Sequence, residues 1–138
     1  MLDETEYLRW IISSKRTLNS ARGDLDRGDY NWVCFKAQQS AELSIKALLH
    51  GLGMPAYGNS ISRLLTMIPK DLKIQKDIIQ ASKTLDKYYV PTRYPNAWTE
   101  GSPEEYYTKE DAEKSILLAE AIIGFVEESW KLLKREGK

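Results

Sequence analysis

The sequence predicts an all-α protein, built as an antiparallel up-and-down bundle of four main helices plus one short helix. Three observations support this fold class. Apolar residues recur at helical spacings of three, four and seven over long stretches, and no stretch shows the alternation that a half-buried strand requires. All five prolines lie between residues 55 and 103. Because proline breaks helix interiors, the long helices are expected near the two ends of the chain.

Two long helices are expected in the first part of the chain, over residues 4–27 and 30–52. Each carries an apolar stripe along one face, as a helix that packs on a core does. Gly28 interrupts the pattern between them, and Asp29 is a candidate N-cap for the second helix. The glycine- and proline-containing segment 51–55 ends that helix.

The remaining helices lie on either side of a proline-rich loop. A short helix is expected near residues 60–68 and a longer one over residues 73–89. Residues 90–107 are expected to form an irregular loop. Thr108 is placed to cap the last helix, with Asp111 in the first turn, where a carboxylate stabilises the helix dipole.

Composition and charge narrow the functions that the chain can perform. Its 138 residues are expected to form a single domain, residues 1–138. Twenty Lys and Arg balance twenty Asp and Glu, which excludes the broad positive field of a nucleic-acid coat protein and leaves only a local patch. One cysteine, Cys34, and one histidine, His50, cannot make a disulfide, a zinc site or a paired-histidine metal site, so no metal or cofactor is expected.

The positions of these two side chains, and the absence of long apolar runs, complete the general picture. Cys34 lies on the apolar stripe of the second helix and is expected to be a small buried side chain. His50 falls in the last turn of that helix, where it favours the helix dipole. No apolar run approaches the ~20 residues of a membrane span, and the acidic N-terminus has no signal-peptide apolar region. We therefore expect a soluble, cytoplasmic protein.

The second helix has apolar residues on two sides. Trp32, Phe35 and Leu43 fall outside its main stripe, and the strip between the two apolar regions holds Gln38, Gln39, Glu42 and Lys46. A helix that is apolar on two sides needs two neighbours. One is the bundle, and the other is predicted to be a second copy of the chain, in a homodimer. The predicted interface residues are Trp32, Phe35, Gln39 and Leu43. The alternative is a helix that is simply central, or scattered surface residues.

The loop before the last helix concentrates aromatic residues around one cation. Six of the 14 aromatic residues of the chain lie within residues 88–107, and Arg93 is the only charge between Lys87 and Glu100. Such an arginine is typical of a phosphate contact, with the rings available for bases. The alternative is that the rings pack the loop onto the bundle while Arg93 pairs with a carboxylate such as Glu42 or Asp86. Composition alone favours this alternative.

Three segments together resemble a known family. Residues 28–49 (GDYNWVCFKAQQSAELSIKALL) resemble the second-helix signature of HEPN domains, a family named for higher-eukaryote and prokaryote nucleotide binding. Residues 89–98 (YVPTRYPNAW) resemble the loop signature of its small stand-alone prokaryotic branch, and residues 111–116 (DAEKSI) match the start of that branch's last helix. The resemblance covers nearly the whole chain.

The resemblance implies a helical bundle that pairs two-fold, with its functional cleft near the dimer interface. It also implies a minimal nucleotidyltransferase as partner, since many members form toxin–antitoxin pairs with one. Several branches are metal-independent endoribonucleases that carry an Arg, four to six residues and then a His. Here Arg93 is followed at those positions by Trp98, Thr99 and Glu100.

These observations lead to three hypotheses about function. The first is a nucleotide- or RNA-binding protein that works with a nucleotidyltransferase. The candidate ligand-binding residues are Gln38, Glu42, Lys46, Asp86, Arg93, Tyr94, Asn96 and Trp98. Arg93 would bind phosphate, Tyr94 or Trp98 would stack on a base, and Glu42 with Lys46 would orient the site. The second is an endoribonuclease toxin with a degenerate motif, to which no catalytic residue is assigned. The third is a non-catalytic dimerising scaffold whose polar residues form only a buried network.

Overall fold

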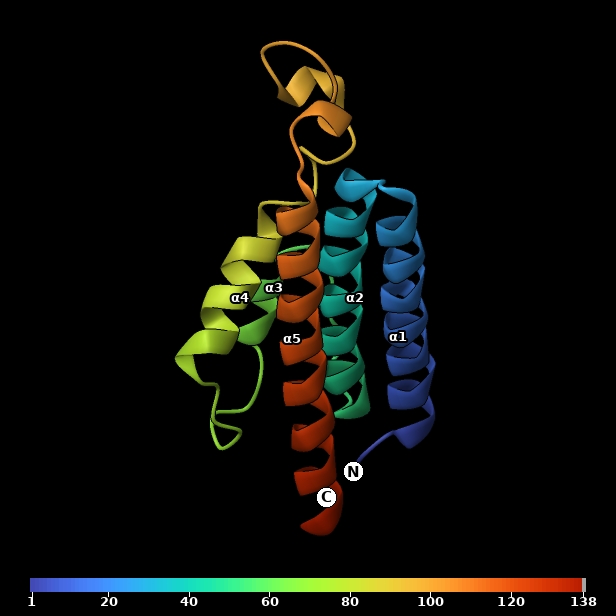
Figure 1. Ribbon diagram of the computed structural model, residues 1–138. Helices are drawn as coiled ribbons and strands as arrows, with labels where there is room; N and C mark the ends of the chain where they lie inside the picture. The colour runs from blue at the N-terminus through green and yellow to red at the C-terminus, as the bar shows by residue number, and fades with distance from the viewer. Residues whose placement is uncertain (138) are drawn as a thin grey trace.

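The computed structural model describes residues 1–137, and these residues are helical with no strand. The helices are α1 (Glu4–Arg27), α2 (Tyr30–Gly51), α3 (Ile61–Leu65), α4 (Lys76–Asp86) and α5 (Lys109–Arg135), with two short 3-10 helices, η1 (Pro95–Ala97) and η2 (Pro103–Glu105). α1, α2, α4 and α5 run up and down in turn, so that both termini lie at the same end of the bundle (Figure 1). The predicted fold class is confirmed.

α2 is the central helix of the bundle. It packs against α1 and α5 and also contacts α3 and α4, and Figure 1 shows it between α1 and α5. Six side chains of its main stripe have no exposed surface: Val33, Cys34, Ala37, Ala41, Ile45 and Leu48. The two residues at the ends of the stripe, Tyr30 and Leu52, are partly buried. Neighbours on several sides are what a helix with two apolar faces requires.

Several helix ends follow the local signals of the sequence. Gly28 adopts a left-handed conformation (φ 81°) and its N–H closes the end of α1 on Asp24 and Leu25. Thr108 and Asp111 form a reciprocal capping box at the start of α5, as expected. Asp29 stands at the N-cap of α2 but its side chain makes no capping hydrogen bond, because it lies 3.5 Å from Arg27 Nε instead.

α4 is shorter than predicted, Lys76–Asp86 rather than residues 73–89. After Asp86 the backbone changes to i→i−3 hydrogen bonds, from Lys87 N to the Thr84 carbonyl and from Tyr88 N to the Leu85 carbonyl, and two side chains then bond to the next carbonyls. Thr92 Oγ1 donates to the Tyr88 carbonyl at 2.7 Å, and the Arg93 guanidinium donates to the Tyr89 carbonyl. These bonds favour a tight turn at this point over continuation of the helix.

The segment between α4 and α5 is more ordered than the expected irregular loop. It contains η1 and η2 and projects beyond the end of the bundle (Figure 1). The Trp98 ring stacks on Tyr106 with centroids 4.0 Å apart, and Trp98 Nε1 donates to the Pro91 carbonyl at 2.7 Å. At its base, Asn31 Nδ2 of α2 donates to the buried Thr92 carbonyl at 3.0 Å. The segment therefore has its own small core and is anchored to α2 by this hydrogen bond, among other contacts.

None of the helices formed by residues 1–137 combines the length and the apolar character that crossing a bilayer requires.

Candidate functional site

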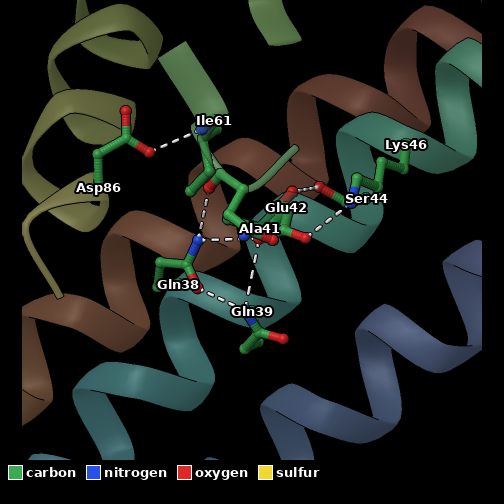
Figure 2. Close-up of polar contacts among 9 residues, drawn as sticks. Gln38, Gln39, Ala41, Glu42, Ser44, Lys46, Ile61 and Asp86 are labelled. Carbon is green, nitrogen blue, oxygen red and sulfur yellow. Dashed lines mark hydrogen bonds and ion pairs between the residues drawn. The ribbon is translucent and has the colours of Figure 1, made fainter. Parts of the chain in front are cut away.

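Four side chains on one strip of α2 form a connected set, called here the α2 polar network: Gln38, Gln39, Glu42 and Lys46. Glu42 Oε1 accepts from Gln38 Nε2 at 3.1 Å, and Glu42 Oε2 accepts from Lys46 Nζ at 2.9 Å. Gln39 Nε2 donates to Gln38 Oε1 at 2.7 Å. The side chains of Glu42 and Lys46 are only 6% and 12% exposed. Figure 2 shows these groups turned toward one another, so their charges and hydrogen bonds are satisfied internally.

The α2 polar network reaches the segment that begins α3. Gln38 Nε2 donates to the Asn59 carbonyl at 3.0 Å. Two residues further on, Asp86 of α4 accepts from the backbone nitrogens of Ile61, at 2.6 Å, and Ser62, at 3.2 Å. It also accepts from the hydroxyls of Ser60 and Ser62. Asp86 thus satisfies backbone N–H groups at the N-terminus of α3 (Figure 2), beside the N-cap residue Ser60, whose hydroxyl accepts from the Arg63 N–H.

Arg93 makes a separate set of contacts, called here the Arg93 cluster: Arg93 with the rings of Phe35, Tyr89 and Tyr94. Its guanidinium carbon lies 4.2 Å from the Phe35 ring centroid, 4.8 Å from that of Tyr89 and 5.0 Å from that of Tyr94. Nε and Nη2 donate to the Tyr89 carbonyl at 2.9 and 2.6 Å. Cation–π contacts and this carbonyl hold the side chain in one orientation.

No carboxylate within residues 1–137 forms an ion pair with Arg93. The expected alternative, a pair with Glu42 or Asp86, is therefore wrong. The physical reason is that each of those carboxylates already has its partners: Glu42 has Lys46, and Asp86 has the start of α3. The guanidinium keeps N–H groups, including both on Nη1, for which the described residues provide no acceptor.

The remaining predicted ligand-binding residues differ in their solvent exposure and in the contacts that they already make. Tyr94 is 48% exposed, and Asn96 in η1 is exposed with no hydrogen bond from its side chain among the described residues. Trp98 is not free in the same way. Tyr106 covers one face of its ring, and the edge of Tyr107 lies 5.7 Å away between centroids. Of the two stacking candidates, Tyr94 is available for a base, and Trp98 supports the loop.

The predicted interface residues are only partly open. Trp32 is 39% exposed and meets the edge of Phe35 at 6.1 Å between centroids. Phe35 is covered by Arg93, and Gln39 belongs to the α2 polar network. Leu43 lines a shallow groove of about 210 Å³ together with Arg9, Trp10 and Ser13 of α1. Phe35 thus packs within its own chain, as expected for a central helix, whereas Trp32 remains partly exposed to solvent.

His50 is remote from Arg93 within the chain. It lies 15 residues after Phe35 on α2, which corresponds to about 22 Å along the helix axis. There its ring stacks on Trp10, with centroids 4.6 Å apart and the planes 7° from parallel. The Arg93 cluster accordingly receives no imidazole from its own chain for proton transfer at neutral pH.

The other titratable groups near the base of the loop are held in their neutral forms. Burial raises the pKa of the Cys34 thiol to about 12, and Cys34 has no exposed surface, as expected. Burial also raises the pKa of Tyr88 to about 12 and raises that of Tyr107. These groups supply neither a nucleophile nor a base at neutral pH. Within residues 1–137, no three His, Cys, Asp or Glu side chains gather as a metal site would need.

Two contacts at the site escaped prediction from the sequence. Asn31 and Thr92, both buried, join α2 to the loop. Tyr89 supplies both a ring and a carbonyl to Arg93. Asn31 and Thr92 carried no sequence signal, because a polar residue at a helix start or in a loop is ordinarily exposed. Tyr89 was visible as one of the clustered aromatics, but its carbonyl contact depends on the turn that follows α4.

Comparison with known proteins places this arrangement in a family. The family model of the HEPN domain matches residues 7–129, which is most of the chain. The chain belongs to the HEPN family. No curated protein matches it. The HEPN assignment agrees with the resemblance that the second helix and the loop had indicated.

Solved structures of similar proteins, two of them described as HEPN proteins, have the same fold. TT1696 from Thermus thermophilus is 43% identical, with a TM-score of 0.88, over 89% of this chain and 97% of that chain. ST0689, an archaeal HEPN homologue, is 41% identical, with a TM-score of 0.74, over 88% and 95%. A HEPN domain protein from Thermotoga maritima, TM0613, is 33% identical, with a TM-score of 0.72, over 92% and 98%.

Proposed function

We propose that this HEPN protein binds nucleotides or RNA, with Arg93 as the phosphate ligand. One observation carries the proposal: the guanidinium is oriented by the Tyr89 carbonyl and three rings, and no carboxylate of the described residues neutralises it. A partly buried cation without an acidic partner favours an anion beside it. Arginine N–H groups match the oxygens of phosphate, and an oriented guanidinium loses little freedom when it binds.

Tyr94 and Asn96 are the groups that would contact the nucleoside. The exposed Tyr94 ring offers a face for a base, a contact worth about 1–3 kcal/mol per base in single-strand binding. The Asn96 amide has both donors and an acceptor for a base edge or a sugar hydroxyl. The other candidate ligand-binding residues support the site indirectly, because their hydrogen bonds hold α2 and α3 in place. They are Gln38, Glu42, Lys46 and Asp86.

Calorimetric titration with adenine and uracil nucleotides tests the phosphate ligand. We expect Arg93→Ala to weaken binding about 10- to 100-fold, the range for losing hydrogen bonds to a charged group. Arg93→Lys should recover only part of the loss, since lysine has no planar fork. Arg16→Ala, which removes an exposed arginine from α1, is the matched control and should bind as wild type does. The proposal fails if wild type binds neither nucleotides nor RNA, or if Arg93→Ala binds equally well.

We also propose that the protein is a homodimer joined through the Trp32 side of α2, with Phe35, Gln39 and Leu43 around it. A tryptophan that is 39% exposed beside another ring supports this surface. Light scattering after size exclusion should give a dimer for wild type and a monomer for Trp32→Glu. Leu117→Glu places the same charge at a 65% exposed apolar residue of α5 and should remain dimeric. If the Trp32→Glu variant is still a dimer, the Trp32 side of α2 is not the dimer interface.

Partnership with a minimal nucleotidyltransferase, as in a toxin–antitoxin pair, is proposed from the family resemblance. Co-expression followed by co-purification tests it. The scaffold hypothesis has one specific observation in its favour, because the α2 polar network is internal. It predicts that a nucleotidyltransferase co-purifies equally with wild type and Arg93→Ala. Nothing in the geometry favours the ribonuclease hypothesis, since His50 lies away from Arg93.

A further inference from the structure

We infer that the Arg93 cluster accepts one phosphate group and its attached nucleoside, and discriminates against a polyphosphate chain or a run of RNA phosphates. This inference rests on the proposed function and specifies its ligand class. Three observations support it: the charges of the loop around Arg93, the ion pairs that the lysines of α2 already form, and the exposure of the rings that contact Arg93.

The loop that carries Arg93 is acidic overall. Residues 87–108, between α4 and α5, contain two bases, Lys87 and Arg93, and three acids, Glu100, Glu104 and Glu105, for a formal charge of −1. Glu105 caps Ser102 at 2.7 Å, while Glu100 and Glu104 are exposed. A second or third phosphate that extends along this loop meets like charge, which costs free energy at short range.

The lysines of α2 offer no second cation to a longer anion. Lys36 Nζ lies 2.7 Å from Asp24 Oδ2 and also donates to Ser20. Lys46 is bonded to Glu42 within the α2 polar network and is 12% exposed. Taking Lys46 to a ligand would leave the Glu42 carboxylate, only 6% exposed, without its counter-ion, and taking Lys36 would remove one of the two cations that contact the equally buried Asp24, the other being Arg27. Lys87, exposed just after α4, is a cation of the same segment that forms no ion pair with residues 1–137.

The rings around Arg93 leave room for one base. The faces of Phe35 and Tyr89 turn toward the guanidinium, which lies 4.2 and 4.8 Å from their centroids. Tyr94 lies at 5.0 Å and is 48% exposed. The next aromatic pair, Trp98 and Tyr106, is stacked on itself at 4.0 Å, and neither ring is among those that contact Arg93, although Tyr106 is 42% exposed. One exposed ring in contact with one oriented guanidinium fits a single nucleotide unit.

A titration series separates the number of phosphates from the presence of the nucleoside. Adenosine, AMP, ADP and ATP, and the matching uridine series, are titrated into the full-length protein at several salt concentrations. We expect at least one series in which the monophosphate binds about tenfold or more tightly than its nucleoside. The di- and triphosphates should bind no more than about threefold tighter than the monophosphate. The slope of log K against log salt should stay near −0.7, the value for one phosphate contact.

Two further arms identify the source of the nucleotide and test Lys87. If 12-mer RNAs of the same bases bind with the same affinity per site as the monophosphate, the protein recognises a single nucleotide within an RNA strand. If they bind much more weakly, the ligand is a free mononucleotide. Both results support a single-phosphate site, and Lys87→Ala should leave every affinity within about twofold of wild type.

Opposite results would overturn the inference. These are affinity that rises about tenfold with each added phosphate, a salt slope of several units, or a large loss in Lys87→Ala. Such results would leave the proposed function standing, because nucleotides would still bind through Arg93. No binding by any nucleotide or RNA would reject the proposed function itself.

Discussion

At the scale of single residues, Arg93 and Glu42 show two ways of stabilising a charge away from water. Arg93 has three rings and a carbonyl, whose cation–π contacts contribute about 0.5–2 kcal/mol each, and keeps N–H groups for a ligand. Glu42 has Lys46, Gln38 and Gln39, and keeps nothing free. The first arrangement is suited to binding and the second to fixing a helix in place.

Glu42→Ala is expected to destabilise the protein. It leaves Lys46 partly buried without a counter-ion and removes the acceptor for Gln38. Breaking a buried pair of this kind costs about 3–5 kcal/mol, and the residual exposure of Lys46 reduces this to about 2–4 kcal/mol. Glu42→Gln keeps an acceptor and should cost less. Urea unfolding measures both changes in the free energy of unfolding.

Glu113→Ala is the control for this measurement, because Glu113 is exposed on α5. It should change the free energy of unfolding by less than about 0.5 kcal/mol. If Glu42→Ala costs no more than the control, the α2 polar network contributes nothing to the fold.

At the scale of elements, α3 depends on residues outside itself. Five residues are too few for a helix that is stable alone. Ile61, Leu64 and Leu65 are buried against the bundle, and Asp86 of α4 satisfies the backbone nitrogens at the N-terminus of α3. The carboxylate thereby joins α3 to α4, while Gln38 joins the preceding residue, Asn59, to α2.

Asp86→Ala should loosen α3 and lower the free energy of unfolding by about 2–3 kcal/mol, as expected for a charged cap with several donors. Amide hydrogen exchange followed by NMR should show loss of protection at Ile61 and Ser62. Asp26→Ala, at an exposed residue of α1, is the matched control. Unchanged protection at Ile61 in Asp86→Ala would contradict the capping role.

At the scale of the whole molecule, burial of protonated groups makes stability depend on alkaline pH. Burial raises the pKa of Tyr7 and Tyr88 from 10.0 to about 12, and that of Cys34 from 9.0 to about 12. Above about pH 9 the folded state holds more protons than the unfolded state. The stability from these groups is therefore complete below pH 9 and is lost as the pH rises toward 12.

We expect the free energy of unfolding to stay level between pH 7 and 8.5. It should then fall by about 1.4 kcal/mol per pH unit from Cys34 alone, and more steeply once the tyrosines of the unfolded state ionise. Urea unfolding between pH 7 and 11 measures the slope. Cys34→Ala should flatten the curve between pH 9 and 10. An unchanged slope in that variant would show that burial of the thiol is not the cause.

The sequence by itself determined the helical elements and most of their ends. The periodicity of apolar residues, the glycine after α1 and the Thr108 cap are local features, and residues 4–27 are helical as predicted. The burial of Cys34 followed from the same periodicity. The HEPN family was also recognisable from the second helix and the loop.

Only the tertiary structure decided which partner each polar group has. Asp86 was grouped with Arg93 from the sequence, yet it caps a helix 25 residues earlier in the chain. The sequence predicts that Tyr94 or Trp98 stacks on a base, and only the structure shows that one face of the Trp98 ring packs on Tyr106. Periodicity and capping act over a few residues, whereas these contacts join distant segments or depend on how a loop folds back on itself. They are set by the packing of α2, α3, α4 and the loop together, which no local pattern contains.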